Sequence, residues 1–254
     1  MQNKVAQYIN KLLLPILDFR KIIYSPVKYV RFWNEYIKYN NLSGTNKAKL
    51  LNIHPFLNDK SEFTHFDAHY VYQHAWFMRN ILKDNPLTHI DVGSSIFFVT
   101  MLSTIVPVTF VDIRPFEVKL PSLCCYKASI LSLPFKGNKI KSISCLHVVE
   151  HVGLGRYGDK LDPDGSRKAL RELARILAPG GKLYLSLPVG QPRICFNAHR
   201  VHKSKEIIET FRRYCISLLD YAAVLDDGNF YDAPDISKLD MQYYACGFFI
   251  FTKK

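Results

Sequence analysis

The sequence has no apolar run as long as the roughly 18 residues that a membrane-spanning helix needs. Its short apolar stretch at 12–17 is followed at once by Asp18 and by no small-residue cleavage site, which is not the pattern of a secretory signal peptide. The six cysteines are scattered, without a CxxC pair or the regular spacing of a disulfide framework. We therefore expect a cytoplasmic protein with reduced thiols, either free in solution or peripheral at the inner face of a membrane.

Acidic residues are scarce, with 22 Asp and Glu against 34 Lys and Arg, and the formal net charge is +12. Much of the excess lies in residues 1–50, where nine basic residues face only Asp18 and Glu35. Such a charge favours polyanionic partners: nucleic acid, phosphorylated or nucleotide-linked substrates, or an anionic membrane. A solvated basic face explains it equally well. We expect peripheral contact of the N-terminal helices with an anionic membrane; the oligomeric state stays open.

The apolar pattern changes along the chain. Residues 1–40 have helical spacing with a break at Pro15, a turn covers 40–44, and 67–82 is again helical. From Thr88 onward, short β-branched runs alternate with helices, as in buried parallel strands. The strands are expected at 88–92, 108–112, 123–127, 140–146, 182–188, 216–225 and 243–252, with helices at 166–177 and 204–214. This pattern predicts an α/β domain over 84–254, with seven mostly parallel strands, and a basic, aromatic-rich helical extension over 1–83.

Two residues at strand ends suggest a nucleotide-like ligand. Gly93 directly follows the first strand, where a glycine lets the backbone turn tightly and approach a ligand. Asp112 closes the second strand, nineteen residues later, and its carboxylate suits the hydroxyls of a ribose. An ordinary turn glycine and a surface aspartate would look the same.

Three later segments carry a family resemblance: Leu133-Pro134-Phe135, the strand that runs into Glu150-His151, and the segment from Arg171 to Leu183 with its Pro-Gly-Gly. Together they resemble the class I S-adenosylmethionine-dependent methyltransferases of the small-molecule, type-11-like group. The resemblance covers 84–254 and implies a Rossmann-like, doubly wound sheet. Further details are similar to an uncharacterised bacterial family associated with surface-polysaccharide gene clusters. These details are 153–159, 162–165, 188–190 and 196–200.

The resemblance implies S-adenosylmethionine as the cofactor. It assigns cofactor contacts to Asp91, Gly93, Ser95, Asp112, Ser129 and His147. Ser95 and Phe97 stand where the family has its second and third glycines, and Phe97 is expected to pack instead. Ser129 replaces the acid that contacts adenine. These departures keep open a non-catalytic Rossmann-like scaffold that has lost the cofactor.

The implied reaction is methyl transfer to a small acceptor, with a sugar or glycan-precursor hydroxyl as the expected nucleophile. Glu150 and His151 follow the fourth strand at the edge where open α/β sheets bind ligands, so they are the candidate bases, together with His199. Candidate substrate contacts are Arg156, Tyr157 and Asp159 in the long loop 153–165, and Asn197 and Arg200 after the fifth strand. Taken singly, each of these residues fits an ordinary structural role in a loop or at a strand end equally well.

Other binding functions are less well supported. The pairs His65/His69 and His147/His151 have i, i+4 spacing, but His147 falls at a strand end and a metal needs three or four converging ligands, so no metal is expected. The aromatic clusters 70–72 and 248–251 are assigned to the core. No nucleic acid is expected, because Leu146-His147-Val148-Val149 stands where amino-methylating DNA enzymes carry an acid-Pro-Pro-aromatic tetrad.

Overall fold

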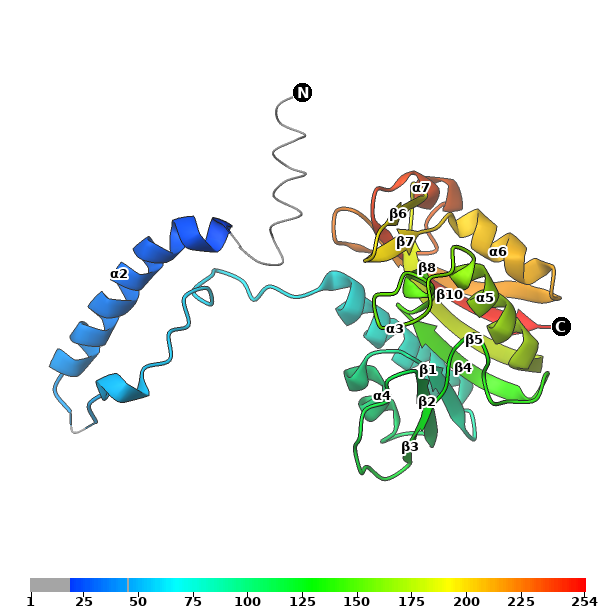
Figure 1. Ribbon diagram of the computed structural model, residues 1–254, viewed down its shortest axis with the longest axis horizontal. Coiled ribbons are helices and arrows are strands. Elements are labelled where there is room, and N and C mark those ends of the chain that lie inside the picture. The colour runs from blue at the N-terminus through cyan, green and yellow to red at the C-terminus, as the bar shows by residue number, and fades with distance from the viewer. Residues whose placement is uncertain (1–18, 45) are drawn as a thin grey trace. The chain divides into compact units, whose positions relative to one another are not determined.

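The computed structural model describes residues 19–44 and 46–254. It divides the chain into an N-terminal unit, which ends at His65, and a larger unit from Phe66 to Lys254 (Figure 1). The helix predicted before Pro15 lies outside the described residues. Among the described helices, none is both long enough and apolar enough to cross a membrane.

The N-terminal unit contains the helix α2 (Phe19–Asn41) and the single 3-10 turn η1 (Leu50–Asn52). The segment after α2 is tied back to the helix by polar contacts. Tyr36 donates a hydrogen bond to the carbonyl oxygen of Ala48 at 3.0 Å, and Lys60 forms an ion pair with Glu35 at 2.9 Å. Few of its side chains are buried, so exposed polar contacts hold this unit together.

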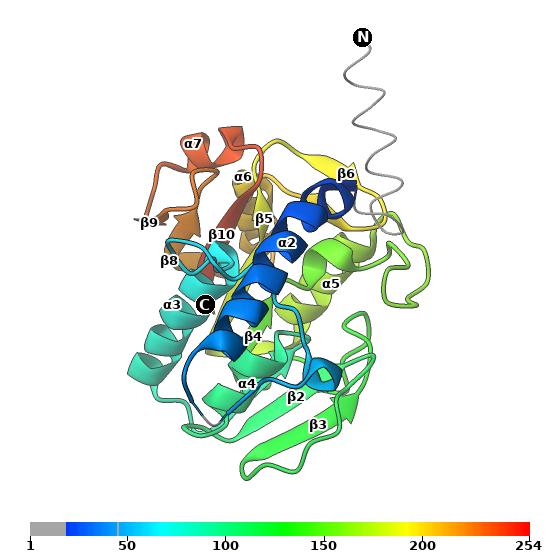
Figure 2. The same cartoon turned by 90° about the vertical axis from the view of Figure 1, so that its left-hand side faces the viewer.

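The larger unit is built on a sheet of eight strands in the order β3-β2-β1-β4-β5-β10-β8-β9 (Figure 2). The strands are β1 (His89–Val92), β2 (Val108–Asp112), β3 (Leu123–Lys127), β4 (Ile140–Leu146), β5 (Leu177–Val189), β8 (Ile216–Val224), β9 (Phe230–Asp232) and β10 (Ala245–Lys253). The first five in sequence are mutually parallel, whereas β10 runs antiparallel to both β5 and β8. The predicted seven-stranded, mostly parallel sheet is confirmed, and the short β9 adds an eighth strand at one edge.

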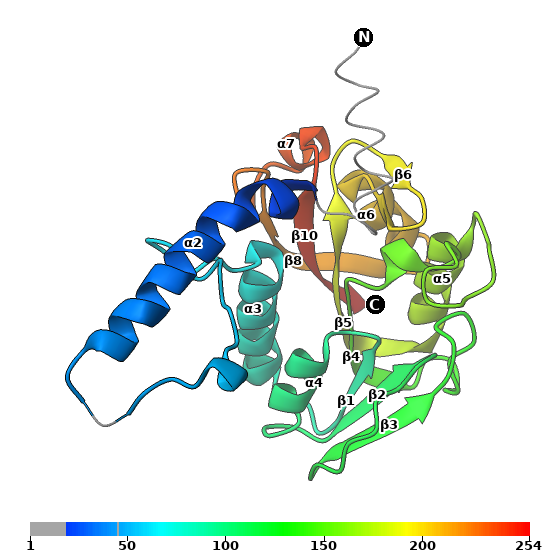
Figure 3. The ribbon, with the colours of Figure 1, turned by 60° about the vertical axis from the view of Figure 1, so that its left-hand side comes forward.

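Helices cover both faces of this sheet (Figure 3). One face packs against α5 (Gly165–Ile176), α6 (Ser204–Arg212) and α7 (Ile236–Met241), through side chains such as Leu173 and Phe211. The other face packs against α3 (Ala68–Asp84) and α4 (Ile96–Leu102), through Phe77 and Phe98. The sheet is thus doubly wound, as the alternation of strands and helices predicts.

The helix α3 belongs to the larger unit, whereas the sequence pattern placed it in the extension that ends at residue 83. Trp76, Phe77 and Ile81 are buried in the core on one face of the sheet. At the end of the helix, Asp84 accepts hydrogen bonds from Tyr184 and Lys182 of β5. Periodicity shows that this helix has an apolar face, but it does not show which surface that face covers.

The topology fixes where a ligand can bind. From β1, the chain leads to β2 on one side of the strand, while β4 lies on its other side, so the connections diverge at the carboxyl end of β1. Ligands of open α/β sheets bind in the crevice at such a switch point. Gly93, Asp112 and His147 directly follow or close β1, β2 and β4, and all three therefore lie at this edge.

Candidate active site

The turn after β1 needs a glycine. Gly93 has a φ of +70°, and a Cβ atom there would lie 3.1 Å from the Val148 methyl groups and 3.4 Å from Oδ2 of Asp112. Both the backbone conformation and the space therefore favour a residue without a side chain. The result is an uncovered stretch of backbone beside the carboxylate that closes β2.

Asp91 stabilises this turn through hydrogen bonds made by its buried side chain. Its side chain is fully buried, accepts a hydrogen bond from the backbone N–H of Ser94 at 3.0 Å, and accepts another from the hydroxyl of Ser144. Burial raises the pKa of Asp91 to about 6, although the hydrogen bonds from the two serines oppose this shift. Asp91 lines neither of the two cavities described below, and its observed contacts are structural ones within the turn.

A first cavity opens above this turn. Its wall includes four residues that the resemblance assigns to the cofactor: Gly93, Asp112, Ser129 and His147. Oδ1 of Asp112 accepts a hydrogen bond from the backbone N–H of Arg114 at 2.7 Å, which leaves Oδ2 on the side of the glycine turn. The carboxylate of Asp112, the glycine turn at Gly93 and the hydroxyl of Ser129 thus line the same cavity at the carboxyl ends of the parallel strands.

The two residues that stand where the family has glycines lie at the start of α4: Ser95 is its N-cap, and Phe97 is in its first turn. The Ser95 hydroxyl accepts the N–H of Phe98 at 3.2 Å, which caps the helix, and it lies 3.0 Å from Nε2 of His74. Ser95 therefore lines neither cavity of the site. The expectation that Phe97 packs is wrong, because its side chain is 78% exposed.

A second, larger cavity of about 710 Å³ adjoins the first, a size in the usual range for small-molecule sites. The two cavities share His147, His151 and Tyr157 in their walls. Polar and aromatic side chains dominate the second wall, which also includes His69, Tyr70, Glu150, Arg156, His199, Asp226 and Tyr244. The structure thus gathers several predicted residues, from separate loops, around two hollows that have wall residues in common.

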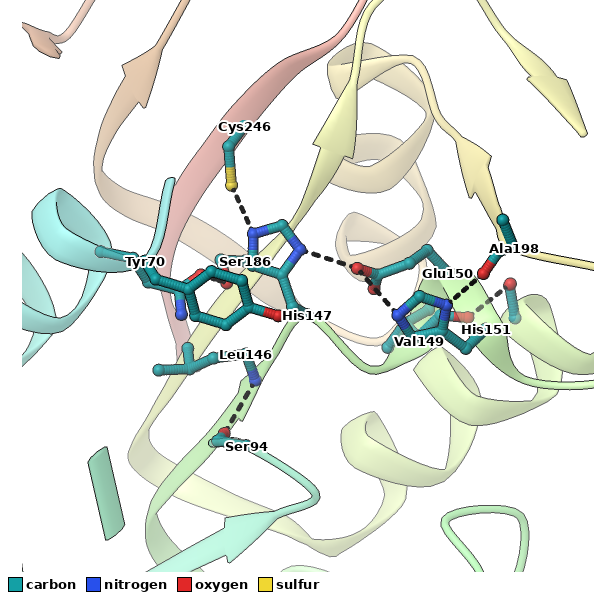
Figure 4. A network of polar contacts seen from close by, with 12 residues as sticks. Tyr70, Ser94, Leu146, His147, Val149, Glu150, His151, Ser186, Ala198 and Cys246 are labelled. Atoms are coloured by element: carbon teal, nitrogen blue, oxygen red, sulfur yellow. Dashed lines mark hydrogen bonds and ion pairs between the residues drawn. The ribbon is translucent and has the colours of Figure 1, made fainter. Parts of the chain in front are cut away.

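His147 stands at the junction in a left-handed conformation, with φ of +57°, that non-glycine residues rarely adopt. Its Nδ1 lies 2.8 Å from the Glu150 carboxylate, and its Nε2 lies 3.1 Å from the Cys246 sulfur (Figure 4). Burial disfavours the imidazolium, but Cys246 and Glu150 outweigh burial and hold the pKa of His147 well above its ordinary value. Strained backbone that the surroundings hold in place is common at functional sites.

Glu150 and His151 lie in the 3-10 turn η2 (Val149–His151) after β4. Glu150 is fully buried; burial alone would raise its pKa, but His147 and His151 together lower it. Nδ1 of His151 lies 2.6 Å from the carbonyl oxygen of Ala198, and because a carbonyl only accepts, this nitrogen carries the proton. Burial lowers the pKa of His151, so the ring is neutral at physiological pH with a free lone pair on Nε2.

The loop after η2 supplies Tyr157 and the residues that hold it. The guanidinium groups of Arg114 and Arg156 lie over the Tyr157 ring, at 4.4 and 5.1 Å from its centre. Asp159 lines the first cavity and also accepts the N–H of Gly153 at 2.6 Å, which closes the loop on itself. Arg156 faces the second cavity, so the loop contributes side chains to both.

The segment that carries Asn197, His199 and Arg200 surrounds the small hairpin of β6 (Arg193–Cys195) and β7 (His199–Val201). His199 lines the second cavity, and its ring centre lies 4.9 Å from that of Tyr244. Asn197 is exposed and lines neither cavity. The predicted substrate contact of Arg200 is replaced by a structural one.

Arg200 is buried with an exposure of 6%, and backbone carbonyl groups occupy its guanidinium. It donates to the carbonyl oxygen of Val152 at 2.6 Å and to that of Asp162 at 3.2 Å. These two residues lie at the opposite ends of the loop that carries Tyr157. Arg200 therefore holds the two ends of that loop together, and it lines neither cavity.

Several residues of the second cavity are not predicted from the sequence. His69 and Tyr70 come from the first turn of α3, where the side chain of Asp67 accepts both of their N–H groups. Tyr244 precedes β10, and its ring centre lies 5.4 Å from that of His69. Assigning the cluster 70–72 wholly to the core is wrong for Tyr70, which lines the cavity. The one available signal was the Asp67 cap, which marks a helix end and so a place where side chains can meet a ligand.

Comparison with known proteins agrees with this architecture. The chain is 13% identical to the [4+2]-cyclase SpnF, with a TM-score of 0.54 over 72% of this chain and 80% of that one. YcgJ from Bacillus subtilis is 14% identical, with a TM-score of 0.52 over 72% and 99%. A Burkholderia thailandensis 1,6-didemethyltoxoflavin-N1-methyltransferase, solved with bound 1,6-didemethyltoxoflavin and S-adenosylhomocysteine, is 15% identical, with a TM-score of 0.50 over 74% of this chain and 80% of that one. The larger unit has the Rossmann-like fold of class I methyltransferases.

Sequence comparison adds less about the reaction. A family model described as "Caenorhabditis protein of unknown function, DUF268" matches residues 133–214, which is less than half of the chain. No functionally curated protein matches the sequence. The solved structures with this fold include a cyclase as well as a methyltransferase, so the fold does not identify the reaction. The reaction has to be inferred from the residues of the site.

Proposed function

We propose that this protein binds S-adenosylmethionine in the first cavity and transfers its methyl group to a small molecule in the second. The observation that carries this proposal is the shared wall of the two cavities, formed by His147, His151 and Tyr157. Connected hollows at the switch point of this fold allow donor and acceptor to meet. Two separate ligand sites without a common wall would not support a transfer.

The residues of the first cavity fit the cofactor. Oδ2 of Asp112 is placed to accept the ribose hydroxyls, and the Gly93 turn leaves a cradle that any Cβ atom would narrow. Ser129 offers a hydroxyl at the far side, where the adenine would lie. When bound, S-adenosylmethionine supplies an electrophilic methyl group on a sulfonium.

His151 is the base in this proposal. Nε2 of His151 would accept the proton of the acceptor hydroxyl when that oxygen receives the methyl group. The Glu150 carboxylate lies 3.7 Å from Nε2 and stabilises the imidazolium that results. His199 lies across the same cavity and is a second polar contact for the acceptor.

We infer that the acceptor is a hydroxyl of a sugar or glycan precursor. The second cavity combines aromatic rings, Tyr70 and Tyr244, with the polar groups of His199, Asp226 and Arg156. Aromatic faces suit the C–H surface of a sugar ring, and the polar groups suit its hydroxyls. Arg156 adds a positive charge that suits a phosphate on a nucleotide-linked or lipid-linked precursor.

The test is transfer of a labelled methyl group from S-adenosylmethionine to monosaccharides, nucleoside-diphosphate sugars and polyprenyl-phosphate sugars, with an amine panel for comparison. We expect incorporation into a sugar-bearing acceptor, loss of turnover but not of S-adenosylhomocysteine binding in His151→Gln, and wild-type behaviour in His65→Gln, whose histidine is exposed and outside the site. Incorporation into amines alone would refute the acceptor class. Failure to bind either cofactor form would refute the whole function and support the non-catalytic scaffold, which the replacement of two glycines by Ser95 and Phe97 favours.

We further infer that the N-terminal unit docks on an anionic membrane. Apolar residues at 27, 30, 33 and 37 recur on one face of α2, where Val27 is 74% and Ile37 is 54% exposed. Basic residues accompany them on the same helix. An amphipathic, basic, aromatic helix of this kind suits the interface of an anionic bilayer.

A further inference from the structure

Three potential metal ligands from distant parts of the sequence converge beside the second cavity. They are His69 in the first turn of α3, His147 after β4, and Cys246 near the start of β10. One ligand atom from each lies within 4.8 Å of the others. Among the described residues this is the one group of histidines, cysteines and acids close enough to share an ion.

The orientation of His147 is that of a metal ligand. Glu150 holds Nδ1 at 2.8 Å, so Nε2 is the nitrogen left for another partner, and it lies 3.1 Å from the Cys246 sulfur (Figure 4). Histidines that bind metals commonly have their second nitrogen fixed by a carboxylate in this way. A cation between nitrogen and sulfur would take the place of the proton that now joins them.

His69 is positioned independently of the other two ligands. Its backbone N–H is held at 3.0 Å by the Asp67 side chain, at the start of α3. Its ring lies parallel to that of His147, at 7° and with centres 5.9 Å apart. Both imidazoles line the second cavity, and a ligand atom of each lies within 4.8 Å of the Cys246 sulfur.

The charges in this region also favour a cation. Glu150 is fully buried, and Oε2 of its carboxylate has no hydrogen-bond partner among the described residues. Cys246 is fully buried as well, where a thiolate without a cation is costly. A divalent ion beside one thiolate and one carboxylate brings the local sum of charges to zero.

We propose that His69, His147 and Cys246 bind a divalent transition metal of the Zn²⁺ type. Two imidazoles and one thiolate match the ligands that Zn²⁺ prefers, and they do not match the oxygen ligands of Mg²⁺ or Ca²⁺. Binding releases the thiol proton and any proton on the two ring nitrogens. With three ligands from the protein, the fourth position of a tetrahedral ion would be open, and because His69 and His147 line the second cavity, the ion would lie at the wall of the acceptor space.

An open fourth position is the feature of catalytic zinc sites, in contrast to closed structural ones. An acceptor hydroxyl bound there would lose its proton more readily, which would assist the base His151. That consequence rests on the proposed methyl transfer, whereas metal binding itself does not. The two claims can therefore fail separately.

The test is titration of the chelator-treated full-length protein with Co²⁺, followed by competition with Zn²⁺. We expect one equivalent per chain, tetrahedral d–d absorption and a thiolate-to-cobalt charge-transfer band. Cys246→Ser should abolish that band, His69→Gln should weaken binding at least tenfold, and Glu150→Gln should weaken it by about 10- to 100-fold. The matched controls Cys195→Ser and His65→Gln should behave as the wild type.

Circular dichroism and calorimetry with S-adenosylhomocysteine show whether each variant is folded. A charge-transfer band that persists in folded Cys246→Ser would overturn the proposal. So would one-equivalent binding that is unchanged in His69→Gln, or the absence of binding at micromolar Co²⁺ and Zn²⁺. If Cys246→Ser does not fold, the charge-transfer band of the wild type together with weakened binding in His69→Gln decides the question.

Discussion

The carboxylate of Asp112 is the side chain on which cofactor binding should depend most. Its Oδ1 accepts the backbone N–H of Arg114 at 2.7 Å, while Oδ2 lies on the side of Gly93 and has no hydrogen-bond partner among residues 19–44 and 46–254. In Asp112→Asn the amide oxygen can still accept from Arg114, so the local turn is retained. The substitution then changes only the charge and the atom that faces the cavity.

The size of the effect follows from the hydrogen bonds that the substitution removes. A hydrogen bond to a charged group contributes roughly 1.5–3 kcal/mol, and the ribose hydroxyls donate at least one such bond to Oδ2. The asparagine NH₂ group would present a donor where an acceptor is needed. We expect a loss of about 2–3 kcal/mol of binding free energy, which is a dissociation constant about 30- to 150-fold higher.

Isothermal titration calorimetry with S-adenosylhomocysteine measures this directly. Glu117→Gln, which removes an exposed carboxylate five residues further along the chain, is the matched control and should bind as the wild type does. Thermal unfolding without ligand should be similar for all three proteins. If Asp112→Asn binds within about threefold of the wild type, Asp112 is not a ribose contact and the cofactor assignment of the first cavity is refuted.

Four further predictions test other parts of the molecule. Gly93→Ala should weaken S-adenosylhomocysteine binding at least tenfold and lower the unfolding free energy by about 1–2 kcal/mol, because φ is positive there; unchanged calorimetry would contradict this. Since burial lowers the pKa of His151, turnover should be flat near neutrality and fall only in acid, and His151→Gln should remove that slope along with most activity. Burial lowers the pKa of His202 to about 4, whereas its pKa in the unfolded chain is about 6.5, so the free energy of unfolding falls as the pH drops below about 6.5. At pH 5 this decrease is about 2 kcal/mol. Urea unfolding of His202→Asn should lack this part of the acid sensitivity. Replacing Val30 and Ile37 of α2 with Asp should reduce co-sedimentation with anionic vesicles several-fold without changing S-adenosylhomocysteine binding, and equal sedimentation would exclude docking through this face.

The sequence predicts the parts of the fold that local pattern determines. The parallel strands β1 to β5 appear as separate apolar runs, and Gly93 and Asp112 lie together because the carboxyl ends of parallel strands share one edge. Even the degraded glycine motif is understandable from its neighbours. Ser95 caps a helix, and the third glycine position tolerates a large side chain because Phe97 is exposed to solvent.

The acceptor side was harder to predict because its residues come from elements that local patterns do not place. Cys246 reaches His147 only because β10 is inserted antiparallel to β5, with Cys246 opposite Pro188, and no local signal specifies that register. Arg200 had the residue type of an anion contact. Its guanidinium instead donates to the backbone carbonyl groups of Val152 and Asp162, which a sequence does not reveal.

The wall that the two cavities share has a thermodynamic consequence. A ligand that reorients His147, His151 or Tyr157 in one cavity alters the free energy of binding in the other. Such coupling is reciprocal: whatever factor the methyl donor imposes on acceptor affinity, the acceptor imposes on the donor. In the proposed methyl transfer, demethylated cofactor left in the first cavity would therefore change the affinity of the second cavity for the next acceptor.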